Sequence, residues 1–60
     1  METFTTFQEA AEAAQEYFST VFGYNNGVGI ESETDNVVEF YSKDDPGMDD
    51  TYYCIIQNTD

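Results

Sequence analysis

The side chains of this chain that could do chemistry are almost all carboxylates. The 60 residues include thirteen Asp or Glu, one Lys and neither Arg nor His, which gives a formal net charge of −12. Without His, the side chain best suited to proton transfer near neutral pH is missing, and no Ser, Thr or Cys has an imidazole base. Paired carboxylates can hydrolyse glycosides, but so short a chain leaves little room for a substrate pocket. We therefore expect no enzymatic activity and no catalytic residue.

The same charge balance excludes several binding partners. Phosphate backbones and anionic lipid surfaces need basic side chains, and this chain offers only Lys43 and its amino terminus. We therefore expect no direct binding of nucleic acid or of a membrane. A single Cys cannot form an internal disulfide or a zinc site by itself, and Cys54 stands in an apolar segment that predicts a buried, inert thiol. The sequence indicates no cofactor.

The segment from Lys43 to Asp50 is the densest acidic stretch of the chain. Four Asp in seven positions offer the oxygen ligands that Ca²⁺ takes. Their spacing departs from the EF-hand pattern D-x-[DN]-x-[DN]-G, and no Glu follows at the twelfth position. We therefore predict no metal site and interpret the segment as a solvated loop, turning at Pro46, that adds to the acidic surface. Calcium binding is the alternative, and it predicts that added Ca²⁺ stabilises the fold.

The composition nevertheless describes a folding chain. Hydrophobic residues make up 40% and aromatic residues 17% of the sequence, whereas disordered acidic tails are poor in both. We expect a single small acidic domain over residues 1–60, whose modest core a homodimer would strengthen. No apolar run approaches the ~18 residues that span a bilayer, and the first residues lack the basic start of a signal peptide. With an unpaired Cys, these features predict a cytoplasmic protein, in the host cell if a phage encodes it.

One amphipathic helix is predicted near the start of the chain. Thr6 and Glu9 form the pattern of a capping box, so the helix begins at Phe7 and extends to about Val21, with Gly23 just beyond its end. Phe4, before the cap, is expected to act as a hydrophobic staple. The apolar residues recur at helical spacing and predict one buried face: Phe7, Ala10, Ala11, Ala14, Phe18, Val21 and Phe22.

Three strands are predicted after the helix, at Val28–Ser32, Val37–Ser42 and Thr51–Gln57. The first two are joined by a short polar turn over residues 33–36. In the second strand Val38 and Phe40 point to one face, while residues 37, 39 and 41 point to the other. Simple connections between neighbours favour an antiparallel meander. The predicted fold class is therefore α+β, with one N-terminal amphipathic helix packed on a three-stranded antiparallel β-sheet in the order α-β-β-β.

Acidic side chains occur on the predicted helix, at the turn between the first two predicted strands, on the second strand and in the loop before the third. A folded surface of one sign creates a potential of several kT, which attracts basic clefts, and the commonest large basic clefts bind nucleic acid. Carboxylates on a rigid scaffold can stand where duplex DNA carries one phosphate charge per ~1.7 Å of its axis. We therefore interpret eleven carboxylates as phosphate mimics that contact a basic partner: Glu9, Glu12, Glu16, Glu31, Glu33, Asp35, Glu39, Asp44, Asp45, Asp49 and Asp50.

A solvated acidic surface, as in a salt-adapted organism, is the simpler interpretation of these charges. It explains the scarcity of Lys but not the ten aromatic residues in sixty. Because Tyr is enriched at protein interfaces, we expect Tyr41 to be a surface contact for the partner. Salt separates the two interpretations, since a salt-adapted domain needs high salt to fold, whereas a DNA mimic folds at low salt and loses association rate as salt rises.

Three short segments add a resemblance: Val28–Ser32, with its Glu-Ser end; Asn36–Ser42, followed by an Asp-containing turn with Pro; and Tyr53–Asn58, with its Ile-Gln. With these segments, roughly a third of the chain, the sequence resembles the phage uracil-DNA glycosylase inhibitors. These are small acidic proteins that mimic DNA and block a host repair glycosylase. That family has a second helix and more strands than this chain can hold.

The resemblance implies roles for individual residues. Glu31 would approach the phosphate-binding edge of the enzyme, with Ser32 beside it, and Val38 and Phe40 would line a pocket for an apolar side chain. The leading hypothesis is a DNA mimic of phage or mobile-element type that occupies the DNA groove of a basic host protein, with uracil-DNA glycosylase as one target. An anti-CRISPR or anti-restriction DNA mimic is the closest alternative. An acidic protein–protein adaptor without a nucleic-acid-site target is the competing class.

Overall fold

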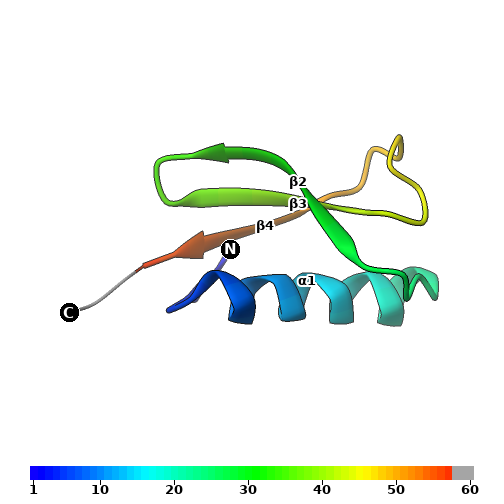
Figure 1. Ribbon diagram of the computed structural model, residues 1–60, viewed down its shortest axis with the longest axis horizontal. Coiled ribbons are helices and arrows are strands. Elements are labelled where there is room, and N and C mark those ends of the chain that lie inside the picture. The colour runs from blue at the N-terminus through cyan, green and yellow to red at the C-terminus, as the bar shows by residue number, and fades with distance from the viewer. Residues whose placement is uncertain (58–60) are drawn as a thin grey trace.

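The computed structural model describes residues 1–57, in which one helix lies against a four-stranded sheet (Figure 1). The predicted helix and the three predicted strands are all present, and a short strand precedes them. The elements follow one another as: β1 (Glu2–Phe4), α1 (Phe7–Phe22), β2 (Val28–Thr34), β3 (Val37–Ser42) and β4 (Tyr52–Ile56).

The start of α1 is fixed by the capping box that the sequence predicts. The Glu9 amide donates to Thr6 Oγ1 at 3.2 Å, and the Thr6 amide donates back to Glu9 Oε1 at 3.2 Å. At the other end Gly23 takes φ 75°, which glycine adopts without steric cost, and its amide caps the carbonyls of Phe18 and Ser19. Within residues 1–57, no helix is long and apolar enough to cross a membrane.

The sheet is mixed, which corrects the predicted three-stranded antiparallel meander. Its strand order is β1-β4-β3-β2, and the two pairings among β2, β3 and β4 are antiparallel as expected. The additional strand β1 pairs parallel with β4, with Glu2 opposite Cys54 and Phe4 opposite Ile56. Three residues are too few for a visible alternation of apolar and polar side chains, so no local pattern predicts β1. Phe4 is consequently a strand residue, and it packs against the core cluster that includes Ala10.

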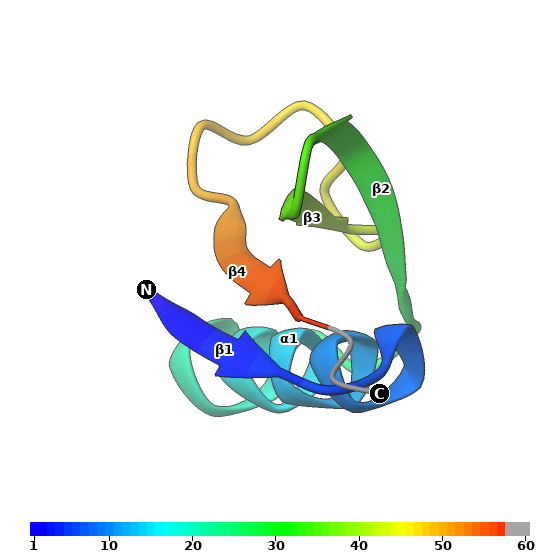
Figure 2. The same cartoon turned by 90° about the vertical axis from the view of Figure 1, so that its left-hand side faces the viewer.

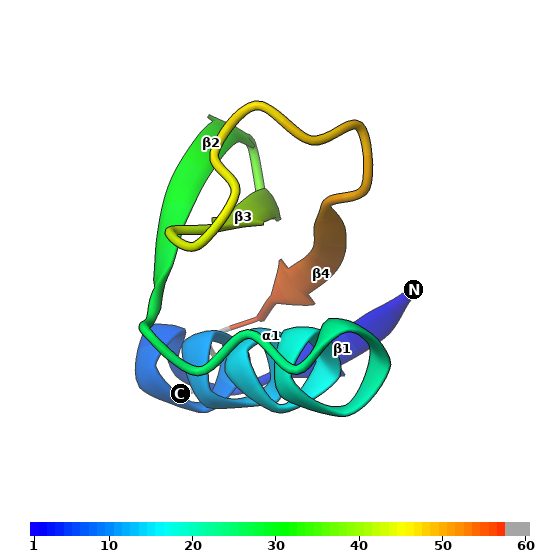
Figure 3. The same ribbon diagram turned by 90° about the vertical axis from the view of Figure 1, so that its right-hand side faces the viewer.

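Two alanines allow α1 to approach the sheet closely. Ala10 and Ala14 are fully buried against a core formed by Val38, Phe40 and Cys54. Because alanine ends at Cβ, the helix axis can lie near the strands without a cavity between them. Figures 2 and 3 show α1 along one face of the sheet, and no second helix within residues 1–57 covers the other face, called the open face below.

Two residues of the predicted buried helix face are more exposed than expected. Phe7 and Val21 are 45% and 55% exposed, whereas Phe18, between them, is fully buried. A 16-residue helix is ~24 Å long, while the five residues of β4 extend only ~17 Å. The last turn of α1 extends past β4 (Figure 1), and Phe7 and Val21 each border an open pocket.

A β-bulge in β2 changes the face on which its acidic end points. The register between β2 and β3 shifts between Ile30 and Ser32, so that Glu31 is the extra residue. After the shift Ser32 lies opposite Glu39 on the open face, and Glu33 lies opposite buried Val38 on the helix side. The strands continue to Thr34 and Val37, so the predicted turn over residues 33–36 is shorter than expected.

The open face carries one close aromatic packing that can be tested. Gly29 lies opposite Tyr41, and a Cβ at position 29 would overlap the Tyr41 ring. We predict that Gly29→Ala displaces this ring and lowers the free energy of unfolding by about 1 kcal/mol, as overpacking does. In the Tyr41→Ala background the same substitution becomes neutral or stabilising, because only the unfolded-chain entropy of glycine is then changed. Urea denaturation of the four proteins of this double-mutant cycle measures the coupling, and additive effects would contradict the predicted contact.

Candidate functional site

The carboxylates cover the surface of the folded chain. Of the twelve Asp and Glu within residues 1–57, eleven are exposed, and only Glu39 is half-buried. One Lys and the amino terminus can pair with at most two of the thirteen carboxylates of the whole sequence. Those within residues 1–57 are spread over β1, α1, the β2–β3 hairpin and the loop before β4, and each group has different contacts.

The helix stripe predicted from Glu9, Glu12 and Glu16 is present and exposed, but its members differ in their contacts. Glu9 is a structural group as well, because its carboxylate accepts the Thr5 and Thr6 amides at 3.2 Å. Glu12 accepts a hydrogen bond from the Gln8 side chain at 3.4 Å. Glu16 borders a pocket on the side of the helix that faces β1 and β4. One member of the stripe, Glu9, therefore also stabilises the start of the helix.

A cluster of hydrogen bonds surrounds Glu39 on the open face. Thr51 Oγ1 donates to Glu39 Oε2 at 2.6 Å, and Ser32 Oγ donates to Glu39 Oε1 at 2.9 Å. The Thr51 bond, followed by the Ser32 bond, lowers the pKa of Glu39 below its ordinary value. A hydrogen bond to Glu39, with the added charge of Glu39 and Glu31, raises the pKa of Tyr53. The bulge thus brings Glu31 and Ser32 to the same face as Glu39.

The other two hairpin carboxylates border a pocket between the hairpin tip and the start of α1. Glu33 and Asp35 lie at its edge, and Asp35 adopts a left-handed φ of 56° in the turn. The pocket has a volume of about 380 Å³, and its apolar side is formed by Phe7, Val38 and Ile56. Val38 borders this pocket but is only 1% exposed, and the pocket role that the family resemblance implies for it stays a prediction. Phe40 is 1% exposed within the core and does not line this one.

The four Asp residues of the loop before β4 differ in their contacts. Asp44 accepts the Asn26 side-chain amide at 2.6 Å and the Asn26 backbone amide at 3.1 Å, and these bonds lower the pKa of Asp44. Asp45, Asp49 and Asp50 are exposed. Within residues 1–57, no group of three or more acidic, His or Cys side chains gathers as metal ligands would. Cys54 is buried as expected, and burial raises the pKa of its thiol.

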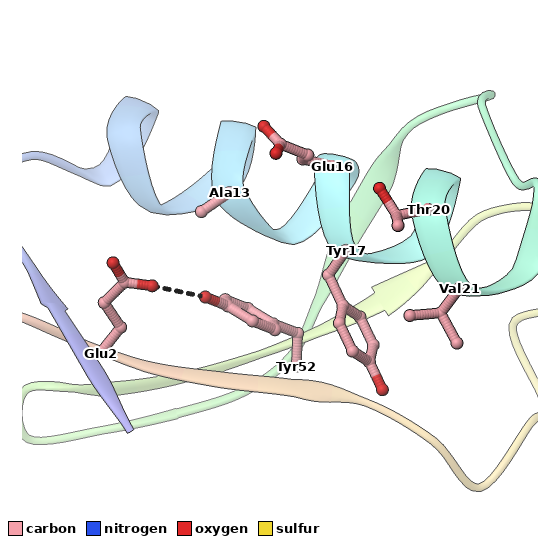
Figure 4. Close-up of a pocket in the computed structure, with 7 residues that line it drawn as sticks. All are labelled: Glu2, Ala13, Glu16, Tyr17, Thr20, Val21 and Tyr52. Carbon is pink, nitrogen blue, oxygen red and sulfur yellow. Dashed lines mark hydrogen bonds between the residues drawn. The ribbon is translucent and has the colours of Figure 1, made fainter.

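A second pocket, which the sequence did not indicate, lies between α1 and the β1–β4 edge of the sheet. Figure 4 shows the Tyr52 ring between Glu2 and Tyr17, below the helical turns that carry Ala13 and Glu16. Tyr52 donates its hydroxyl hydrogen to Glu2 Oε1 at 3.3 Å. Glu2 lies beside Tyr52 because β1 pairs with β4. Since no sequence pattern predicts β1, none could identify Glu2 as a site residue.

Tyr41, the predicted aromatic contact, lies half-buried on the open face above Gly29. It therefore presents only part of its ring to a partner. Asn58, the last residue of the third segment in the family resemblance, lies outside the described residues. Comparisons with protein-family models, curated proteins and solved structures found no match to this chain. The resemblance to the glycosylase inhibitors therefore rests on the three short segments alone.

The hydrogen bonds around Glu39 predict a specific pH response. We expect Thr51→Val to raise the Glu39 pKa toward its ordinary value of 4.5, because the largest cause of its lowering is removed. Since the folded-state pKa is lowered, the stability that Glu39 contributes is complete above pH 4.5 and is lost as the pH falls through the lowered value. A carboxyl-carbon NMR titration measures the shift. Thr34→Val, on the exposed end of β2, is the control, and an unchanged Glu39 pKa in Thr51→Val would contradict the assignment.

Proposed function

We propose that this protein binds a basic DNA-binding enzyme in the groove that DNA would occupy, and so inhibits it. The observation that carries this proposal is the exposure of eleven carboxylates on a folded body that has almost no internal cations to neutralise them. A surface of this kind steers the protein toward basic clefts. It also repels phosphate backbones, so the partner is a protein that binds DNA and not DNA itself.

The dimensions of the body support the same proposal. It measures 35 × 19 × 16 Å, and one turn of duplex DNA is about 34–36 Å long. Duplex DNA carries one charge per ~1.7 Å, or roughly 20 charges over such a length. Thirteen carboxylates therefore supply more than half the charge of the duplex that they would replace. A cleft that accommodates one turn of DNA has the length and the sign of potential to accept this protein.

The hairpin is the part of the surface that we assign to the partner's phosphate-binding edge. The three acidic residues at the end of β2 and in the following turn are all exposed, and the bulge spreads them over both faces of the hairpin: Glu31, Glu33 and Asp35. Figure 1 shows β2 rising from beside the end of α1, so that the tip of the hairpin lies above the start of α1 at one end of the molecule. Carboxylates on both faces of a projecting hairpin can contact both walls of a groove.

The test is a competition measurement on defined enzymes. Uracil-DNA glycosylase is the first target because the family resemblance names it, and a restriction endonuclease and a CRISPR effector are tested beside it. We predict that the protein raises the apparent KM for duplex DNA and leaves kcat unchanged for at least one of them. Between about 50 and about 200 mM salt, the inhibition should weaken by at least about tenfold, because the association is electrostatically steered.

Matched neutral variants locate the contact. Glu31→Gln with Asp35→Asn removes two charges from the hairpin, and Asp49→Asn with Asp50→Asn removes two from the loop. Both pairs are exposed, so neither change is expected to alter the fold. We expect the hairpin pair to weaken inhibition more. Two results would contradict the proposal and favour the adaptor class. Either none of the three enzymes is inhibited, or the inhibition persists in excess duplex DNA.

A further inference from the structure

The pocket between α1 and the β1–β4 edge has the features of a binding site for one side chain. Its volume is about 420 Å³, and two tyrosine rings form one wall, with centroids 5.4 Å apart and planes 37° apart. Val21, 55% exposed, continues the apolar wall toward the end of the helix. The residues around it come from three elements: Glu2, Ala13, Glu16, Tyr17, Thr20, Val21 and Tyr52.

The charge at this pocket is negative and held in place. Glu2 and Glu16 border it, and none of its seven lining residues is basic. Burial, and then the charge of Glu2, raise the pKa of Tyr52, so the hydroxyl stays protonated and keeps donating to Glu2. This hydrogen bond orients the Glu2 carboxylate beside the tyrosine rings (Figure 4). A cation entering the pocket would meet carboxylates and aromatic faces together.

We propose that this pocket receives an arginine side chain of the partner protein. A planar guanidinium stacks on aromatic rings and donates hydrogen bonds from its edge to carboxylates, and the alkyl stem of arginine suits the apolar wall at Ala13 and Val21. Lysine, a compact and strongly hydrated point charge, would use the rings less well. The inference rests on the proposed function in one respect, namely that the arginine belongs to a basic DNA-binding protein.

The pocket at the hairpin tip is the less suitable of the two. It also has two carboxylates at its edge, Glu33 and Asp35, but Phe7 supplies its one aromatic ring. That ring already packs against Phe40, with centroids 5.6 Å apart. The hairpin-tip pocket therefore serves as a comparison within the same protein, because it has a similar charge but lacks the pair of tyrosines.

An NMR titration of the full chain tests the proposal with no enzyme present. The probe is N-acetyl-arginine amide, and N-acetyl-citrulline amide is the neutral control of nearly the same shape, with ionic strength matched by NaCl. We expect saturable shifts at the pocket residues, smaller shifts at Glu33 and Asp35, and binding of citrulline weaker by about fivefold or more. Glu16→Gln should weaken arginine binding about two- to fivefold, whereas Glu12→Gln, one turn away and outside the pocket, should not.

The outcomes separate this inference from the proposed function. Equal shifts with both probes, shifts that do not saturate, or shifts spread evenly over all carboxylates would overturn the arginine site and leave the DNA-mimic proposal to its own enzyme test. Saturable arginine binding without inhibition of any enzyme would support the site and contradict the assigned source of the arginine. Tyr17→Leu should also reduce binding, and because Glu16 is exposed, Glu16→Gln keeps the test valid if Tyr17→Leu unfolds.

Discussion

The close packing of α1 against the sheet is the interaction on which the rest of the structure depends. Charge repulsion within a chain of net charge −12 opposes compaction, and no disulfide is available to resist it. The apolar contact beneath Ala10 and Ala14 supplies the opposing term, because it buries Phe40 and Cys54 almost completely. Every carboxylate of the described chain lies outside this contact. Water and counterions therefore screen the repulsion between the carboxylates, and no charge is buried in the core.

Several of these carboxylates also stabilise local structure. Glu9 completes the helix cap, Glu39 accepts hydrogen bonds from β2 and from the loop before β4, and Asp44 fixes the loop after α1 through Asn26. These three carboxylates therefore accept hydrogen bonds from backbone and side-chain donors of the protein itself. An acidic surface of this kind cannot be neutralised uniformly without loosening the fold, and only the carboxylates without such bonds can be changed for purely electrostatic reasons.

The sequence predicted the parts of the fold that local chemistry determines. The capping box located the helix start at Phe7, and the alternation of Val38 and Phe40 identified the buried face of β3. It did not predict β1, because three residues show no period, and so it missed Glu2 and the tyrosine pocket. The bulge at Glu31 was also invisible, since it arises from pairing between strands and leaves no local pattern.

The parallel pairing of β1 with β4 has a consequence for how the chain folds. Glu2 lies opposite Cys54, so β1 can join the sheet only by pairing with a strand about fifty residues further along the chain. Closing so long a loop is slow compared with forming the helix or the β2–β3 hairpin. The helix and the hairpin need only local contacts, whereas β4 must pair with both β3 and β1. A chain that stops before Tyr52 would lack β4, the strand that pairs with both β1 and β3, and β1 would then have no partner in the sheet.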